Sequence, residues 1–148
     1  MAEIKAEMML ALKEAMKNHD NERRDTIRLL QSAVKQYEID KQVEASDDII
    51  IDILQKEAKK RRESIEELNQ NDRPEQAAAE EAELVIIGSF LPEPLSEDEL
   101  RRIIKAAVEQ SGAQSVKEMG MVMGLVMPQV KGRADGKLIN QITREFLG

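Results

Sequence analysis

The sequence predicts an all-α protein, on three observations. Residue types that favour helices, chiefly alanine, leucine, methionine, glutamate and lysine, are abundant among the 148 residues. The chain has only two phenylalanines and one tyrosine, and it has no tryptophan, although aromatic residues are enriched in strands. Apolar residues recur every three or four positions along most of the chain, which is the spacing of a helix with one buried face. We therefore expect helices and no sheet.

The first two helices are predicted from this spacing and from a polar break. Apolar residues at helical spacing run from Ile4 to Met16, and the polar residues 18–21 mark the end of that helix. A second helix is expected over about residues 22–43, with its apolar residues facing the first.

The next two helices have clearer start signals. Ser46 offers a hydroxyl cap, and the two aspartates that follow it suit the positive end of a helix dipole. This third helix should end at the polar break 69–73. Pro74 then stands where the first turn of a helix tolerates proline, and the fourth helix should run to about Ser89.

A boundary between two domains is expected at Pro92 and Pro94. Two prolines so close together restrict the backbone and cannot donate backbone hydrogen bonds. We therefore divide the chain into an N-terminal four-helix domain, residues 1–92, and a C-terminal three-helix domain, residues 93–148.

Start signals also define the three C-terminal helices. In a capping box, a serine and a glutamate three residues later cap each other's backbone N–H groups at the start of a helix. Two such pairs are present, Ser96 with Glu99 and Ser115 with Glu118. The first helix should end at Gly112, the second should kink or end near Met127 because of Pro128, and Asp135 should cap a last helix over residues 136–147.

The charge of the chain is unevenly distributed. The formal net charge is -7, which opposes non-specific wrapping of nucleic acid. Residues 1–92 contain 21 acidic and 14 basic residues, whereas residues 93–148 contain eight of each. A surface that binds anions is therefore expected in the C-terminal third.

Composition also bears on the cellular compartment. Cysteine is absent, which fits a reducing compartment and leaves no thiol for metal binding or catalysis. Residues 1–18 contain no apolar segment of the kind found in signal peptides or membrane spans. We expect a cytoplasmic protein without a membrane partner.

No pattern in the sequence predicts an autonomous active site. There is no glycine-rich phosphate loop, no serine elbow and no metal-ligand spacing, so we predict no catalytic residue, no cofactor and no metal. The only histidine, His19, lies in the first polar break without a partner and is interpreted as a solvated turn residue.

Two charged clusters are also interpreted as solvated faces. The basic run at residues 59–62 has glutamates at pairing distance on the same helix, which favours salt bridges over a phosphate site. The acidic cluster of Glu80, Glu81 and Glu83 has no ligand geometry beyond proximity.

The last helix predicts a surface that could bind a phosphate backbone. On a helical wheel one side is apolar and should face the core, with Leu138, Ile139, Ile142 and Phe146. The other side carries two cations and two amides without an acid: Lys137, Asn140, Gln141 and Arg144. Just before it, Lys131 and Arg133 flank Gly132, where the missing side chain permits positive φ and close approach of a partner. We call Lys131, Gly132, Arg133, Lys137, Asn140, Gln141 and Arg144 the tail surface, and we expect it to bind the phosphate backbone of a nucleic acid by charge and by amide hydrogen bonds.

The preceding helix contains two glycines four residues apart, Gly120 and Gly124. Glycine destabilises a helix, so its presence there calls for a reason. Either the glycines allow a tight helix crossing inside the domain, or they let an RNA approach the helix closely. The neighbouring methionines are interpreted mainly as adaptable core.

The same C-terminal residues resemble a known family. Gly124, Lys131-Gly132, Ala134, Ile139-Asn140 and Leu147 are similar to the tail domain of the B subunit of glutamyl/aspartyl-tRNA amidotransferase, and the stretches "FLPEPLSEDEL" and "KGRADGKL" resemble the stand-alone YqeY-like branch of this GatB/YqeY family. The resemblance to that branch extends over essentially the whole chain. It departs from the amidotransferase tail at Pro128, where a lysine is usual, and at Asp135-Gly136, where Asn-Pro is usual, so weaker RNA binding is expected here.

The resemblance implies a helical tail that contacts tRNA, without transferring an active site. The family is linked to carbon-nitrogen ligase activity with glutamine as the amide donor, which in the amidotransferase depends on other parts of the complex. For this chain it implies tRNA or another structured RNA as a partner, together with an amidotransferase or another translation-related protein.

Three hypotheses for function follow. In the first, the C-terminal domain docks on structured RNA and the acidic N-terminal helices restrict or extend that docking. In the second, the chain is a protein-interaction module without nucleic acid. In the third, it supplies a docking domain to a separate catalytic assembly for tRNA-dependent amidation.

Overall fold

The chain folds into seven α-helices and one 3-10 turn within residues 3–148, the part that the computed structural model describes. No strand occurs in that part, so the all-α prediction is confirmed. The helices form two compact units, Met1–Leu91 and Pro92–Gly148, and each has its own hydrophobic core.

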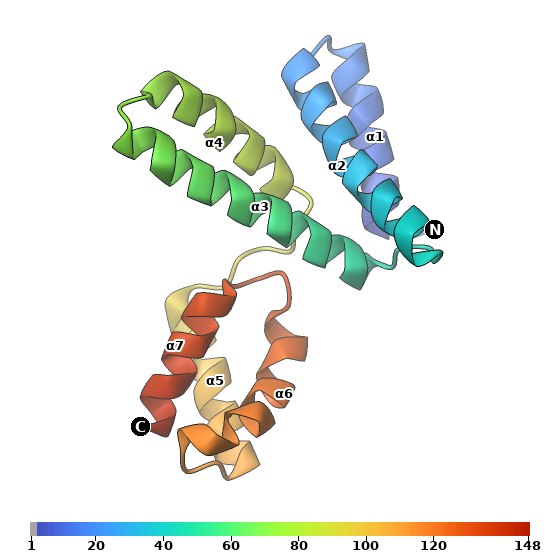
Figure 1. Cartoon of the computed structure of the whole chain (residues 1–148). Helices are drawn as coiled ribbons and strands as arrows, with labels where there is room; N and C mark the ends of the chain where they lie inside the picture. The colour runs from blue at the N-terminus through green and yellow to red at the C-terminus, as the bar shows by residue number, and fades with distance from the viewer. Residues whose placement is uncertain (1–2) are drawn as a thin grey trace. The chain divides into compact units, whose positions relative to one another are not determined.

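The first unit consists of two helical hairpins (Figure 1). Short connections join α1 to α2 and α3 to α4, which makes each pair antiparallel. The bounds are Glu3–Lys17 for α1, Asn21–Lys41 for α2, Asp47–Gln70 for α3 and Pro74–Gly88 for α4. Six large side chains from all four helices are almost fully buried: Met8, Ile27, Leu30, Ile50, Leu54 and Ile87.

Local capping explains where these helices begin. The hydroxyl of Ser46 accepts a hydrogen bond from the backbone N–H of Ile49 at 3.3 Å, as the sequence predicted. His19 lies between α1 and α2 with a φ of 56°, and its side chain is exposed. The interpretation of His19 as a turn residue is therefore confirmed.

One carboxylate, that of Glu38, ties α1, α2 and the α2–α3 connection together. It accepts a hydrogen bond from Lys5 Nζ at 2.7 Å and another from the backbone N–H of Ala45 at 2.8 Å. The bond from Lys5 and then the bond from Ala45 lower the pKa of Glu38 below its ordinary value. Nearby, Asp47 accepts a bond from the backbone N–H of Ile4 at 3.0 Å, which joins α1 to the start of α3.

Arg61 departs from the solvated face expected for residues 59–62. Its side chain is only 12% exposed, and it pairs with Glu57 on α3 and with Glu83 on α4, the latter at 3.1 Å. These ion pairs and their hydrogen bonds offset the cost of burying the guanidinium. Arg61 therefore links α3 to α4. Lys59, Lys60 and Arg62 are exposed, as expected.

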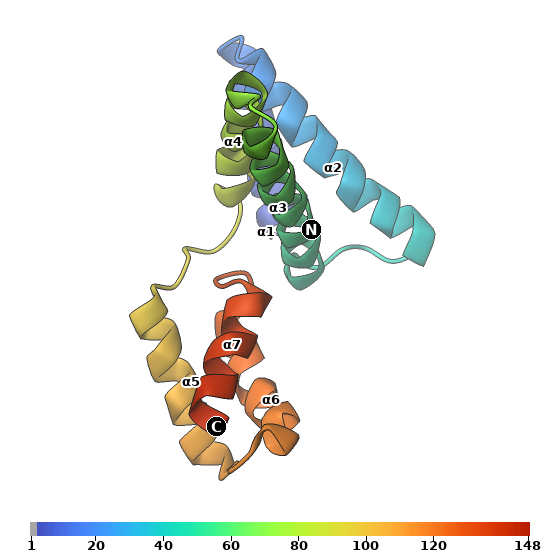
Figure 2. The ribbon, with the colours of Figure 1, turned by 60° about the vertical axis from the view of Figure 1, so that its left-hand side comes forward.

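The second unit is a three-helix arrangement in which each helix packs against the other two (Figures 1 and 2). Its elements are α5 at Glu97–Ser111, the 3-10 turn η1 at Val116–Glu118, α6 at Met119–Val130 and α7 at Gly136–Leu147. The buried side chains at its centre are Leu100, Ile104, Val122, Val126, Ile139 and Ile142.

The caps of α5 and α7 agree with the sequence, whereas the second capping box does not form. Ser96 accepts from Glu99 N at 3.1 Å and Asp135 accepts from Lys137 N at 3.3 Å. Ser115, in contrast, makes no capping hydrogen bond, because the chain there forms a 3-10 turn and α6 begins only at Met119. A capping box needs an α-helical first turn, which the sequence pattern alone did not guarantee.

Two further expectations about the second unit concern Pro128 and Phe146, and the one for Phe146 is wrong. A kink or an end was expected near Met127, and α6 contains Pro128 and ends three residues after Met127, at Val130. The side chain of Phe146 is 38% exposed and is not in the core. The buried side of α7 instead includes Thr143, whose hydroxyl donates to the carbonyl of Ile139 at 2.7 Å and is thereby satisfied within the helix.

The segment before α5 is bonded to the turn between α6 and α7. The backbone N–H of Leu95 donates to the carbonyl of Arg133 at 2.8 Å. In return, Arg133 Nε donates to the carbonyl of Glu93 at 3.0 Å. The proline-rich segment after Pro92 is therefore part of the second unit and not a free linker.

The cap of α5 gives a test confined to one unit. Ser96→Ala should lower the stability of the second unit by about 1 kcal/mol, because an N-terminal N–H of α5 loses its acceptor. Hydrogen exchange should accelerate at amides in residues 97–147 and stay unchanged in residues 3–88. Ser32→Ala, at an exposed position in the middle of α2, is the control. Equal effects of the two substitutions would contradict the role of the cap.

The lowered pKa of Glu38 can be tested by measuring the stability of the protein at several pH values. A carboxyl group with a lowered folded-state pKa stabilises the protein above its ordinary pKa, and this stability is lost as the pH falls through the lowered value. Glu38→Gln should therefore reduce the free energy of unfolding at pH 7. The difference from the unchanged protein should shrink below about pH 4. Urea unfolding followed by circular dichroism at several pH values measures this, and a difference independent of pH would contradict the assignment.

Candidate nucleic-acid interface

The outer side of α7 carries four of the predicted binding residues. Lys137, Gln141 and Arg144 are exposed, and Asn140 is half-buried. Arg144 Nε donates to Asn140 Oδ1 at 2.8 Å, one helical turn away. This bond uses one of the five N–H donors of the guanidinium and holds it beside the amide, which suits recognition of a planar or tetrahedral anion.

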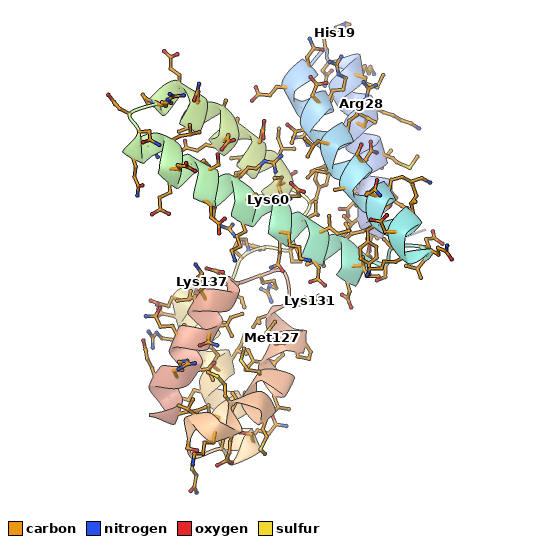
Figure 3. The ribbon with its side chains drawn as sticks, viewed as in Figure 1. His19, Arg28, Lys60, Met127, Lys131 and Lys137 are labelled. Carbon is orange, nitrogen blue, oxygen red and sulfur yellow. The ribbon has the colours of Figure 1, made fainter. Side chains whose placement is uncertain are left out.

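The turn before α7 brings Lys131 and Arg133 to the start of that helix. Lys131 and Lys137 lie at the same end of the unit, on either side of the turn (Figure 3). Both Lys131 and Arg133 are half-buried, and Arg133 is bonded to Glu93 as described above. Arg133 therefore also holds the fold together, a role that its position in the sequence did not indicate.

Gly132 has a more limited role than the sequence suggested. Its φ is 76°, in the left-handed region that favours glycine, so the predicted positive φ is present. The residue is buried, however, which leaves no room for a partner to approach its backbone. Gly132 therefore serves the tail surface by shaping the turn that carries Lys131 and Arg133.

Two acidic residues beside this surface, Asp135 and Glu145, are engaged within the fold. Asp135 caps α7. Glu145 pairs with Arg101 of α5 at 2.8 Å, and Arg101 also lies 3.6 Å from Glu97. The bond to Glu145 raises the pKa of Arg101 above its ordinary value. The outer side of α7 therefore stays acid-poor at its centre, because the neighbouring carboxylates face their own partners.

The glycines of α6 are exposed, which rules out a tight helix crossing as their reason. A Cβ atom added at Gly120 or Gly124 would meet nothing within 4 Å. Met121 and Met127 are 55% and 41% exposed, so the expectation that they belong to the core is wrong for these two methionines. Met119 and Met123 are half-buried. The exposed side of α6 is therefore apolar, and no residue in Met119–Val130 is charged.

The described residues offer no arrangement typical of a metal centre. No three His, Asp or Glu side chains in residues 3–148 gather in a way that would hold a metal ion. Glu83, from the acidic cluster of α4, is instead paired with Arg61. Over the same residues, no helix has the combination of length and hydropathy that a membrane crossing requires.

Comparison with known proteins gives relatives of two kinds. The chain is 29% identical over 142 residues to altered inheritance of mitochondria protein 41, mitochondrial, of Pyrenophora tritici-repentis, covering 93% of this chain and 77% of that protein. It is 43% identical over 75 residues to the E subunit of glutamyl-tRNA(Gln) amidotransferase of Thermococcus gammatolerans, covering 48% of this chain and 11% of that protein.

A bacterial amidotransferase is similar over a comparable length. The B subunit of aspartyl/glutamyl-tRNA(Asn/Gln) amidotransferase of a Thermoanaerobacter species is 37% identical over 75 residues, covering 45% of this chain and 16% of that protein. The chain thus spans only a small part of either amidotransferase relative, and the likeness is to their C-terminal region.

The family itself is established by a match over nearly the whole chain. The model of one family covers residues 5–147, which includes all of the helices from α2 to α7 and most of α1. The resemblance drawn from "FLPEPLSEDEL" and "KGRADGKL" is therefore confirmed. The chain belongs to the family of YqeY-like proteins.

Proposed function

We propose that this protein docks on tRNA or another structured RNA through the tail surface. The observation that carries the proposal is the outer side of α7, where Lys137 and Arg144 are exposed while Asp135 caps the helix and Glu145 is paired with Arg101. The likeness to amidotransferases whose names include tRNA supports RNA over other polyanions.

The contacts would divide into charge and hydrogen bonding. Lys131, Arg133, Lys137 and Arg144 would neutralise phosphates, while Asn140 and Gln141 would donate to phosphate or ribose oxygens. Because contacts of this kind read the backbone and not the bases, they give affinity and orientation without sequence selectivity. This suits an accessory protein that positions an RNA for another factor.

We place any chemistry in a partner and not in this chain. The carbon-nitrogen ligase activity with glutamine as amide donor, linked to the related family, would belong to an amidotransferase or another translation-related assembly, with this chain supplying a docking surface. We infer action in a reducing compartment such as the cytoplasm, which the absence of cysteine fits.

A protein-interaction role is the second candidate, and the exposed side of α6 favours it. Gly120, Gly124, Met121 and Met127 form an uncharged surface to which another helix could pack closely. The same surface also suits the first candidate, since the glycines let a ribose edge approach the helix. Binding of tRNA distinguishes the two.

Charge reversal on α7 is the direct test of RNA docking. Lys137→Glu together with Arg144→Glu should weaken binding to total tRNA at least tenfold at moderate salt, because two of the four proposed phosphate contacts become repulsive. For the unchanged protein, the logarithm of affinity should fall with the logarithm of salt concentration with a slope of about -3, as expected for four contacts. A titration by fluorescence anisotropy measures both quantities.

The control for this test is the double variant Lys59→Glu and Arg62→Glu. It changes the net charge by the same amount on exposed positions of α3. Its affinity for tRNA should stay within about twofold of the unchanged protein, since charges outside the contact surface are largely screened. Equal loss in both double variants, or no binding by the unchanged protein, would refute docking through the tail surface.

A substitution at Arg133 can separate the effect of its charge on RNA binding from the effect of its hydrogen bond on the fold. Arg133→Lys keeps the positive charge but loses the Nε donor to Glu93. We expect affinity for tRNA to stay within about threefold, while proteolysis between residues 91 and 96 becomes faster. Timed digestion with mass analysis of the fragments measures the second effect. Unchanged cleavage would mean that the bond to Glu93 does not restrain this segment.

A further inference from the structure

A second surface lies in the first unit, in a groove between α1 and α2. The groove has a volume of about 310 Å³ and is open to solvent along one side. Its apolar lining comes from Met8, Met9 and Val34. Met8 and Val34 are almost fully buried and form the floor, whereas Met9 is 43% exposed and forms part of the wall. This volume is enough to accept a large apolar side chain or two smaller ones.

The polar lining of the groove is positively charged on balance. Lys5, Lys35 and Glu38 also line it. Glu38 is the only carboxylate among the lining residues, and it is occupied by Lys5 and by the backbone N–H of Ala45. Lys35 lines the groove and is exposed to solvent. Lys35 is therefore the cation that an incoming ligand meets.

The same character continues along both helices beyond the groove. Met16 follows Met9 by seven residues on α1, and Arg28 precedes Lys35 by seven residues on α2, so each pair lies on one side of its helix. Arg28 Nη2 lies 3.8 Å from Met16 Sδ, which shows that these two sides meet. Both residues are exposed, and Arg28 is labelled on α2 in Figure 3.

The groove lies in the part of the first unit that has no acidic excess. Residues 3–41 contain eight acidic and eight basic residues, and Lys35 lines the methionine-lined groove while Arg28 lies beyond it on the same helix. A solvated surface would need neither the apolar floor nor the exposed methionines, which are typical of surfaces that adapt to a partner helix. RNA would find too few cations and mostly apolar surface there.

We propose that the α1–α2 groove binds an acidic amphipathic helix of a partner protein. Apolar side chains on one face of that helix would enter between Met9 and Val34. Its carboxylates would pair with Lys35 and Arg28 along α2, which fixes the direction in which the helix lies. The proposal is independent of RNA docking, because it uses no residue of the tail surface.

A labelled peptide tests the groove directly. The probe is a fluorescein-labelled peptide of about 16 residues, long enough to form a helix, with leucines on one face and glutamates on the other. Titrated with the full chain, it should bind with a Kd in the range of about 10–100 µM. A matched peptide with lysine in place of every glutamate should not bind detectably in that range, because Lys35 and Arg28 would repel it.

Two variants locate the binding. Lys35→Glu with Arg28→Glu should weaken binding of the acidic peptide at least tenfold, whereas the control Lys59→Glu with Arg62→Glu should change it less than twofold. Met9→Gln, an exposed position that should not disturb folding, should weaken binding about fivefold by removing apolar contact. The Met9 variant keeps the test decisive if the double variant unfolds.

Three results would overturn the proposal. One is the absence of saturable binding of the acidic peptide. Another is equal weakening by the groove variant and the α3 control, which would indicate attraction by overall charge. The third is displacement of the acidic peptide by tRNA, together with loss of tRNA binding in the Lys35→Glu and Arg28→Glu variant. That result would make the groove an RNA site.

Discussion

The turn between α6 and α7 is the constraint on which the second unit depends. Gly132 adopts a positive φ that turns the chain sharply, and the next residue, Arg133, is thereby placed to bond twice to the segment before α5. One bond uses its carbonyl and the other its side chain. The start of α5, the end of α6 and the start of α7 are thus held at one end of the unit, with Lys131 and Lys137 beside them. The same turn that closes the fold also brings the cations together.

Electrostatic pairing decides which charges remain available to a partner. In both units, several carboxylates are used within the fold: Glu38 by Lys5 and Ala45, Glu83 by Arg61, and Glu145 by Arg101. Net charge therefore describes this molecule poorly. A chain with an overall charge of -7 still presents Lys35 and Arg28 beside one groove and Lys137 with Arg144 on one helix.

Signals that act within one helical turn could be predicted from the sequence. Ser46, Ser96 and Asp135 cap helices as expected, since a cap depends on residues no more than three positions away. Expectations that depended on the surroundings of a helix were less accurate. Pro128 lies in the last turn of α6, and the helix ends two residues after it, at Val130. Phe146 was assigned to the core from helical spacing, yet burial of Thr143 and Leu147 shows that the buried side of α7 is rotated away from it.

Only those parts of the candidate site that depend on local spacing within one helix could be predicted from the sequence. Helical spacing placed Lys137, Asn140, Gln141 and Arg144 on one side of α7, because their relation is local. The structural role of Arg133 rests on contact with Glu93, 40 residues away, and no local pattern reports such a contact. The α1–α2 groove was missed because its lining comes from two helices, with Met8 and Met9 on α1 and Val34 and Lys35 on α2, and no local pattern reports which residues of two helices meet.

The acidic first unit does not argue against RNA docking by the second. At physiological ionic strength, charges more than about 8 Å from a phosphate are strongly screened. An RNA seated on α7 would therefore interact mainly with the cations in direct contact and only weakly with carboxylates farther away. Lowering the salt concentration lengthens the range of both the attraction by cations and the repulsion by carboxylates. Any repulsion of RNA by the acidic unit would therefore be strongest at low salt, the condition in which the cationic contacts are also strongest.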